Sequence, residues 1–340
     1  MTSDRRTVLV ARLDALGDVL VAGPAIRAVA ASASVLLLTG PRGRDAAALL
    51  PDVDDIVTWA APWIEPAPAP QANQEHLDEL VSAVRDRGVR EAVILTSFRQ
   101  SALPLAMALR LAGVARICAI SEDYPGSLLD VRLADPGDVP EPERALTVAR
   151  AAGFHLAGDD DGALAVRRPL PDTGHLTGSD DYVVLHPGTS VPARAWPLGR
   201  WVETARLVTD MGTRVVVTGA PLEKALTEEV AAPGGTDLGG RTSLPELADV
   251  LDRATAVVVG NTGPAHLAAA VATPVVSLFA PTVPAARWAP YGTRVELLGD
   301  QNAACRDSRA RTCPVPGHPC LSAVTPTDVV AGLRRLGVPA

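Results

Sequence analysis

The stretch from Ala254 to Phe279, ATAVVVGNTGPAHLAAAVATPVVSLF, contains the pattern that decides the fold. Its first apolar run predicts a strand that ends at Gly260. A polar hinge follows, and a helix is expected to begin near Pro264, since proline suits the first turn of a helix. A second apolar run from Pro274 predicts another strand. Continuous apolar runs, rather than alternating ones, are typical of parallel strands covered on both faces, so the stretch predicts one strand–helix–strand unit of a parallel sheet.

The same alternation of strands and helices runs along the whole chain. In the first half, the predicted strands span residues 7–13, 34–39, 54–60, 91–98 and 115–120, and the predicted helices span residues 18–31, 44–50, 76–88, 101–113 and 142–154. In the second half, the predicted strands span residues 181–187, 214–220, 255–260 and 274–281, and the predicted helices span residues 198–212, 222–231, 244–254 and 265–272. This order predicts an α/β protein of two doubly wound, Rossmann-like domains. Ligands bind such sheets beyond the carboxyl ends of the strands, and a cleft between the two domains is expected there.

A polar stretch rich in glycine and proline, residues 156–181, separates the two halves and is the best candidate for a linker. We assign residues 1–165 to the first domain and residues 166–181 to the linker. The second domain is expected to span residues 182–325, and residues 326–340 to form a final helix.

Composition excludes several classes of protein. The chain has 340 residues, of which 47% are hydrophobic and 21% charged, so two globular cores are expected. A net charge of −8 argues against a general nucleic-acid binder. The first apolar run is broken by Arg12, which does not fit a secretory signal, and no uninterrupted apolar run reaches the ~18 residues of a membrane span. We expect a cytoplasmic protein, and a peripheral contact with the inner face of a membrane stays open.

Three of the four cysteines lie close together in the stretch CRDSRARTCPVPGHPC, at Cys305, Cys313 and Cys320, and the fourth is Cys118. His318 is a further ligand type in this stretch. Zinc sites usually contain paired cysteines separated by two residues, and no such pair occurs here. We therefore expect a proline-rich loop with reduced thiols and no metal, and the sequence assigns this loop no role.

Two carboxylates follow the first predicted strand, in the stretch RLDALGD. Asp18 comes directly after Gly17, and a glycine there permits a substrate to approach the backbone closely. A carboxylate at this edge could take a proton from an alcohol, and Asp14 is a second candidate. Asp18 could equally be only a helix cap. No Gly-x-Gly-x-x-Gly pattern follows the strand, so a dinucleotide cofactor is not expected.

Groups suited to phosphate follow the strands of the second half. The loop after residue 185 offers hydroxyls and glycine N–H groups, and Arg194 could make a charge-assisted bond to a phosphate. Glu223, after the next strand, could bind ribose hydroxyls or only complement a helix dipole. The hinge after Gly260 opens a helix N-terminus, which attracts anions. The candidate donor-site residues are His186, Gly188, Thr189, Ser190, Arg194, Glu223, Asn261, Thr262, Gly263 and His266.

Six segments in this order resemble glycosyltransferase family 9, the ADP-heptose:lipopolysaccharide heptosyltransferases and their relatives: residues 12–28, 186–201, 218–223, 240–254, 260–282 and 287–292. The resemblance implies the GT-B fold, with the nucleotide sugar in the second half and the acceptor mainly in the first. It also implies transfer with inversion, and a final helix that crosses back toward the first domain. Asp18 matches the family's presumed general base, and Arg194 matches a basic residue that contacts the diphosphate. Thr262, Gly263 and His266 match its Asp-Thr-Gly-x-x-His motif.

The chain departs from the family pattern at three positions. Asn261 stands where the family commonly has aspartate, Asp14 stands where heptosyltransferases often have serine, and Ser308 stands where relatives have a cysteine. The motifs do not fix the sugar, the nucleotide base or the acceptor. The resemblance favours heptose from ADP-heptose, a glycan, glycolipid or small-molecule acceptor, and no cofactor beyond the donor.

Two other functions fit the same fold. A nucleotide-sugar epimerase would alter the donor without an acceptor, and it usually needs further acidic residues. A binding protein that has lost catalysis would be stabilised by a nucleotide sugar and turn none over. The presence of Asp18 favours a transferase over such a binding protein.

Overall fold

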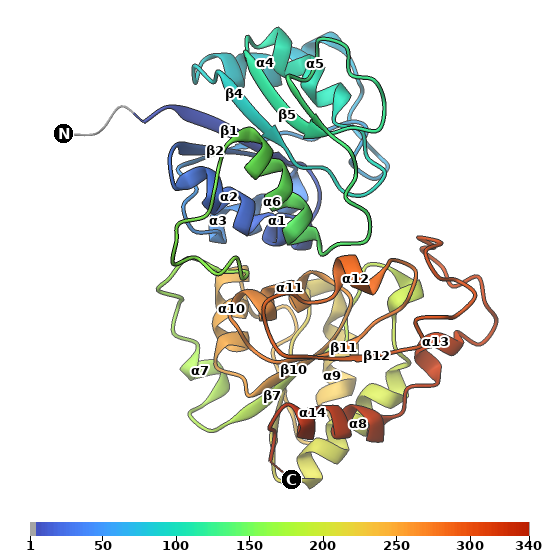
Figure 1. The fold of residues 1–340 in the computed structure, drawn as a ribbon. Coiled ribbons are helices and arrows are strands. Elements are labelled where there is room, and N and C mark those ends of the chain that lie inside the picture. The colour runs from blue at the N-terminus through green and yellow to red at the C-terminus, as the bar shows by residue number, and fades with distance from the viewer. Residues whose placement is uncertain (1–4, 340) are drawn as a thin grey trace. The chain divides into compact units, whose positions relative to one another are not determined.

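The computed structural model describes residues 5–339, and the chain divides into two compact units, residues 1–167 and 168–340 (Figure 1). Each unit contains a six-stranded parallel sheet with helices on both faces. The predicted architecture of two doubly wound α/β domains is therefore confirmed. The division between the units falls within the stretch predicted as a linker.

The first sheet has the strand order β3-β2-β1-β4-β5-β6, with all neighbours parallel. Because the chain leaves β1 in one direction and returns on its other side as β4, the switch point of the topology lies between these two strands. The strands are β1 (Thr7–Arg12), β2 (Ser34–Thr39), β3 (Asp55–Thr58), β4 (Glu91–Ile94), β5 (Arg116–Ile120) and β6 (Val131–Leu133).

Helices cover both faces of the first sheet (Figure 1). One face is covered by α1 (Leu16–Val21), α2 (Gly23–Ala30), α3 (Arg44–Leu49) and α6 (Glu141–Ala152), and the other by α4 (Gln74–Arg85) and α5 (Leu103–Leu111). The single helix predicted over residues 18–31 is wrong, because the structure has α1 and α2 there. Pro24 lacks the N–H group that a continuous helix would donate to Leu20, so the chain begins a new helix.

The second sheet has the strand order β12-β11-β10-β7-β8-β9, again with all neighbours parallel. Counted from its own first strand, this is the order of the first sheet, and its switch point lies between β7 and β10. The strands are β7 (Tyr182–His186), β8 (Arg214–Val217), β9 (Thr236–Asp237), β10 (Ala256–Gly260), β11 (Val275–Leu278) and β12 (Val295–Leu298).

Helices also cover both faces of the second sheet. One face carries α8 (Leu198–Asp210), α9 (Lys224–Ala231) and α14 (Pro326–Arg335), and the other carries α10 (Leu244–Asp252) and α11 (Gly263–Ala270). The short helices of this unit are α7 (Gly174–Thr177), α12 (Ala285–Trp288) and α13 (Pro319–Ser322). Within residues 5–339, no helix is both long enough and apolar enough to span a bilayer.

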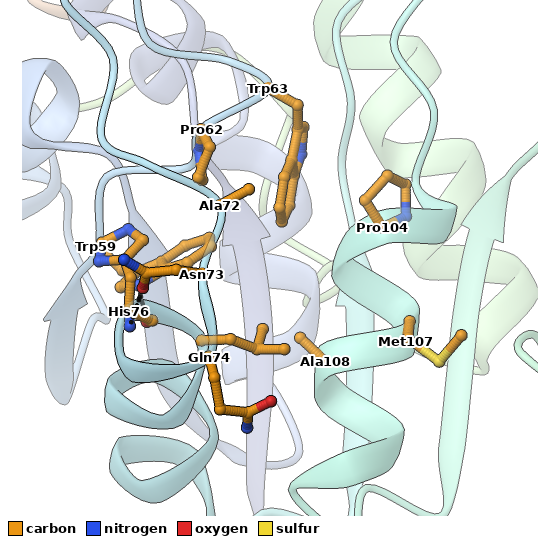
Figure 2. A pocket seen from close by; sticks show the side chains of 11 residues that line it. Trp59, Pro62, Trp63, Ala72, Asn73, Gln74, His76, Pro104, Met107 and Ala108 are labelled. Carbon is orange, nitrogen blue, oxygen red and sulfur yellow. Dashed lines mark hydrogen bonds between the residues drawn. The ribbon is translucent and has the colours of Figure 1, made fainter.

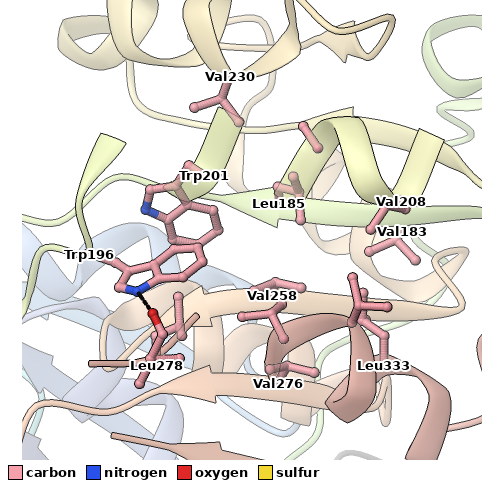
Figure 3. Packing of buried hydrophobic residues seen from close by; sticks show 14 of the residues in the cluster. Val183, Leu185, Trp196, Trp201, Val208, Val230, Val258, Val276, Leu278 and Leu333 are labelled. Atoms are coloured by element: carbon pink, nitrogen blue, oxygen red, sulfur yellow. Dashed lines mark hydrogen bonds between the residues drawn. The ribbon is translucent and has the colours of Figure 1, made fainter. Parts of the chain in front are cut away.

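Two tryptophans anchor the loop after β7 to the core of the second unit (Figure 3). The rings of Trp196 and Trp201 meet edge to face, with centroids 5.2 Å apart and planes at 84°. Trp196 Nε1 donates to the carbonyl oxygens of Leu321 and Val324, each at 3.2 Å. The segment that carries Arg194 is thus fixed two residues later by a buried, hydrogen-bonded side chain.

The last helix, α14, packs within the second unit. Its apolar face, Val329, Val330 and Leu333, is buried in the same core as Trp196, and the helix lies against α8 and β12. Burial of this apolar face on the second sheet removes it from water there. That residues 326–340 cross back toward the first domain stays a prediction.

Leu333→Ala should lower the free energy of unfolding of the second unit by about 2–5 kcal/mol, the usual range for truncating a fully buried leucine. The measurement is amide hydrogen exchange of β10 and β11 under native conditions. Arg334→Ala, an exposed neighbour on the same helix, should change this value by no more than about 0.5 kcal/mol. Equal effects of the two substitutions would show that α14 contributes no core packing.

Candidate functional site

A cluster of charged and polar side chains lies at the switch point of the first sheet. Arg12 is the last residue of β1, Asp14 is in the following turn, and Asp18 is in α1. Ser97 and Gln100 come from the loop after β4 and contact Asp14. The carboxyl ends of the two central strands therefore bring together residues more than 80 positions apart in the chain.

Arg12 holds this cluster together. Its Nε lies 3.1 Å from Asp14 Oδ2, its Nη2 donates to Asp18 Oδ1 at 2.9 Å, and its Nη1 lies 3.6 Å from Glu141 Oε2. The side chain is almost fully buried. Burial alone lowers the pKa of Arg12, but the carboxylates around it outweigh that effect, and the net shift is upward. A buried guanidinium paired in this way stays charged and fixes the positions of its partners.

Both oxygens of Asp14 are hydrogen-bonded within the cluster. Oδ1 accepts from Gln100 Nε2 at 2.6 Å, and Oδ2 accepts from Ser97 Oγ at 3.1 Å and faces Arg12. Burial raises the pKa of Asp14 above its ordinary value, although Arg12 and the two hydrogen bonds act in the opposite direction. Asp14 is therefore enclosed and has little capacity left for a ligand.

Asp18 is the more accessible of the two carboxylates. Its side chain is 22% exposed, against 10% for Asp14. Oδ1 accepts from Arg12 and lies 3.0 Å from Ser97 Oγ, whose single proton can be donated to Asp14 or to Asp18. Among residues 5–339, Oδ2 accepts only the Ala15 N–H, at a long 3.3 Å. One oxygen of Asp18 is thus fixed, and the other can accept a further hydrogen bond.

Asp14 and Asp18 were predicted from the sequence, but Ser97 and Gln100, which contact Asp14, were not. Their signal was present in the polar run TSFRQS directly after the strand at residues 91–94. The role of Arg12 was missed because it lies inside the apolar strand pattern, where a buried ion pair is rare.

At the switch point of the second sheet, His186 ends β7. Its Nδ1 and Thr218 Oγ1 share a hydrogen bond of 2.9 Å. Burial lowers the pKa of His186 from its ordinary value of 6.5 to about 4. The ring is therefore neutral at physiological pH, and it can donate or accept a hydrogen bond without carrying charge.

Gly188 and Glu223 lie in direct contact. A Cβ atom built on Gly188 would overlap Glu223 Oε2, so a larger residue would displace the carboxylate. Glu223 Oε2 also accepts the Ala220 N–H at 2.8 Å. Of the neighbouring hydroxyl residues, Thr189 accepts the Val191 N–H at 3.2 Å, and Ser190 is exposed. The structure thus brings Glu223 to the loop after β7.

Arg194 joins that loop to the end of β10. It lies in a short 3-10 turn, Pro192–Arg194, and its Nη1 donates to the carbonyl oxygen of Asn261 at 3.1 Å. Thr262 and Gly263 follow as the N-terminus of α11, and His266 is buried one turn further on. The predicted donor-site residues of β7 and β10 are therefore neighbours in space.

The Asn261 side chain is buried and lacks partners. The residue is 5% exposed, and neither its amide oxygen nor its amide nitrogen has a hydrogen-bond partner in the described part of the chain. Thr282 Oγ1, in the loop after β11, is also buried without a hydrogen-bond partner in the described part of the chain, and this residue was not predicted from the sequence. Buried polar atoms of this kind are usually satisfied, so they indicate a place where a ligand or water supplies the missing bonds.

The cysteine loop shows no arrangement for a metal. All four cysteines are free thiols, and no group of three or more metal-ligating side chains occurs within residues 5–339. His318 Nε2 instead pairs with the carbonyl oxygen of Ala193 at 3.0 Å. Burial, followed by the neighbouring Cys305 and Cys313, raises the pKa of Cys320 to about 11, so this thiol is protonated at neutral pH.

The neutral state of His186 makes stability depend on pH. Since the pKa of His186 is about 4 when folded and near 6.5 when unfolded, the unfolded chain binds the extra proton between these values. The contribution of neutral His186 to the free energy of unfolding is fully present above pH 6.5. It should fall by ~3 kcal/mol as the pH drops toward 4. His186→Gln should remove this part of the slope, measured by urea unfolding from pH 4 to 7. The two proteins share all other titrating groups, so parallel curves would contradict the prediction.

Comparisons with known proteins agree with this architecture. A sequence model of glycosyltransferase family 9 (heptosyltransferase) matches residues 133–318. Lipopolysaccharide heptosyltransferase 3 of Escherichia coli is 28% identical over 179 residues, which cover 50% of this chain and 51% of that protein. Lipopolysaccharide heptosyltransferase 1 of Salmonella typhimurium is 38% identical over 108 residues, which cover 31% and 34%. The matched segments thus cover about half of the first relative and about a third of the second.

Solved structures show the same fold at low sequence identity. A family 9 glycosyl transferase from Veillonella parvula superposes with a TM-score of 0.75 at 14% identity, covering 99% of this chain and 98% of that one. ADP-heptose lipopolysaccharide heptosyltransferase II of E. coli gives 0.73 at 20% identity, covering 97% and 98%. The predicted GT-B fold is confirmed by these likenesses. Because the family model matches more than half of its residues, the chain belongs to glycosyltransferase family 9.

Proposed function

We propose that this chain is an inverting glycosyltransferase that moves a sugar, most simply heptose, from an ADP-linked donor to a hydroxyl of a glycan, glycolipid or small molecule. The observation that carries the proposal is the Asp18 carboxylate, which has one oxygen fixed by Arg12 and the other open. The names of the relatives and of the solved structures, several of which contain ADP or an ADP-heptose, support the choice of donor.

Asp18 acts as the general base in this proposal. As the acceptor oxygen attacks the anomeric carbon, its proton passes to Asp18 Oδ2, and the bond from that carbon to the diphosphate breaks. A single displacement from the opposite face inverts the configuration, and the nucleoside diphosphate leaves. Asp14 is secondary because its oxygens are already hydrogen-bonded, and it helps to hold Ser97 and Arg12 in place.

The donor diphosphate is placed at the end of β7 and the start of α11. Helix N–H groups near Gly263 and the charge of Arg194 would stabilise the leaving diphosphate as its charge grows. Glu223, held against Gly188, is suited to ribose hydroxyls, and the open amide of Asn261 to a donor hydroxyl. The reaction proposed here uses no metal or organic cofactor, and a membrane contact belongs to it only where the acceptor is a glycolipid.

The direct test is to incubate the purified protein with ADP-heptose, UDP-glucose or GDP-mannose, each with and without a panel of glycan and glycolipid acceptors. Nucleoside diphosphate released only when an acceptor is present, together with a glycosylated product, supports the transferase. An altered donor sugar without acceptor identifies an epimerase instead. Thermal stabilisation by a nucleotide sugar without turnover identifies a binding protein.

Arg194→Ala should weaken binding of ADP-heptose by roughly 1.5–3 kcal/mol, the usual contribution of a hydrogen bond to a charged group. Isothermal titration calorimetry measures this change. Arg206→Ala is the matched control, because Arg206 is an exposed arginine of the same unit that pairs with Asp210 on α8. Unchanged affinity in Arg194→Ala would reject this position for the diphosphate.

Asp18→Asn keeps the size of the side chain but cannot take a proton at neutral pH. It should reduce turnover by roughly 10²–10⁴-fold, the scale of general-base catalysis, and leave donor affinity nearly intact. Asp14→Asn should reduce turnover much less. Steady-state rates of both variants with one working acceptor decide between the two residues. If Asp14→Asn is inactive and Asp18→Asn is active, their roles must be exchanged.

A further inference from the structure

The first unit contains a pocket of about 340 Å³ that no residue of the proposed reaction occupies. Three segments form its walls: the turn after β3 (Trp59–Trp63), the start of α4 (Asn73–Leu77) and the first half of α5 (Pro104–Ala108) (Figure 2). In a parallel sheet, strand ends and the starts of the following helices lie at the same edge. The pocket is therefore at the carboxyl edge of the first sheet, as is Asp18.

Aromatic rings form much of this pocket. The ring of His76 stacks on Trp59, with centroids 4.8 Å apart and planes at 18°. Trp63 is tilted by 58° against Trp59 at 5.5 Å, and 39% of it is exposed. Figure 2 shows the Trp63 ring beside the open space, with Pro104 and Met107 on the other side. The exposed fraction of Met107 is 51%, so two large apolar side chains face water at the mouth of one pocket.

The polar atoms around the pocket are largely used within the protein. Trp59 Nε1 donates to the carbonyl oxygen of His76 at 3.1 Å, and His76 Nε2 pairs with the carbonyl oxygen of Ala60 at 2.8 Å. Asn73 Oδ1 accepts the His76 N–H at 2.9 Å, and Gln74 Nε2 donates to a side chain of its own helix at 2.7 Å. What remains for a ligand is mainly carbon and ring surface. Such a lining suits an apolar group better than a sugar ring, whose hydroxyls need several partners.

The pocket is connected to the carboxylate cluster by a short piece of chain. The loop after β4 carries Ser97 and Gln100, which contact Asp14, and it then reaches Pro104 in the pocket wall. Gln100 and Pro104 are four residue steps apart, so the chain between them spans at most about 14 Å when fully extended. One acceptor molecule of moderate size could therefore place a hydroxyl near the cluster and another part in the pocket.

We propose that this pocket binds an apolar hydrocarbon group of the acceptor, carried on the part of the molecule away from the reacting hydroxyl. The assignment of this group to the acceptor rests on the proposed function. An apolar cavity of about 150 Å³ holds one benzene ring, and this pocket has roughly twice that volume, which fits several linked carbons or a fused ring. Such a group could be the alkyl chain of a lipid or the ring of a small molecule.

The test compares glycosides that differ only in their apolar group: methyl, phenyl and n-octyl β-D-glucopyranoside, each below its critical micelle concentration. Calorimetry with the full chain and no donor should show at least one of the larger glycosides binding about tenfold or more tightly than the methyl glycoside, because each buried methylene or ring carbon adds to the hydrophobic free energy. Tighter binding of the octyl glycoside points to a lipid chain, and tighter binding of the phenyl glycoside to a ring. Equal affinity for all three overturns the proposal.

Two substitutions on α5 separate the pocket from general adsorption. Met107 and Leu111 lie one turn apart and are similarly exposed, at 51% and 53%, but only Met107 lines the pocket. Met107→Lys should weaken binding of the preferred glycoside about tenfold, and Leu111→Lys should leave it unchanged. If both variants lose glycoside binding equally, or if both lose binding to phosphatidylcholine vesicles equally, the exposed side chains of α5 form a membrane-facing surface. Either result would overturn the proposal that the pocket binds an apolar group of the acceptor.

The result of the glycoside-binding test does not depend on whether the chain transfers sugar from ADP-heptose. Met107→Lys should bind ADP-heptose as the wild type does, because no donor-site residue lies in this pocket. If the glycosides fail to discriminate while ADP-heptose is still transferred, only the pocket assignment is wrong. If the glycosides behave as expected and no sugar is transferred, the pocket remains and the proposed reaction is wrong.

Discussion

The ion cluster around Arg12 is the interaction on which the candidate chemistry depends. A guanidinium at the end of a buried strand is stable only with its charge compensated, and here Asp14, Asp18 and Glu141 compensate it. The same contacts fix one oxygen of Asp18 and leave the other open. In the proposed reaction, a carboxylate held in this way needs no rearrangement before it accepts a proton, which is how positioning contributes to rate. One arrangement thus compensates the buried charge of Arg12 and also orients the Asp18 carboxylate.

Both sheets have the same strand order, and each places its polar residues at the corresponding point. In each unit, the first and fourth strands are neighbours at the centre of the sheet, and the loops that follow them lead to helices on opposite faces. The room between these two loops is filled by their side chains. In the first unit this room contains Asp18 and Ser97, and in the second it contains Arg194 beside the main chain of Asn261. The two units thus share one strand order but carry different side chains at the switch point. Those of the first unit are rich in carboxylates, and those of the second include the arginine expected to bind an anion.

The sequence predicted most of the fold, because buried parallel strands are continuous apolar runs that can be recognised singly. It missed β6, β9 and β12, which are short or half-buried and have no such run. The packing of α14 against α8 and β12 could not be predicted, because an amphipathic pattern shows that a face is buried but not against which surface. Within the candidate site, the sequence could predict that residues next to strand ends lie together, since topology brings those ends to one edge of the sheet. Their partners Ser97, Gln100 and Glu141 were missed, because these contacts form only through space.

The buried amide of Asn261 has a consequence for selectivity. An amide presents a donor nitrogen with two N–H groups and an acceptor oxygen, whereas the carboxylate common in the family presents acceptors alone. A hydroxyl can satisfy either atom of Asn261, because it both donates and accepts. A fully ionised phosphate oxygen can pair only with the nitrogen, and it would leave the amide oxygen buried and unsatisfied. In the proposed donor site, Asn261 would therefore favour a hydroxyl over an ionised phosphate oxygen through the direction of a hydrogen bond, without using charge.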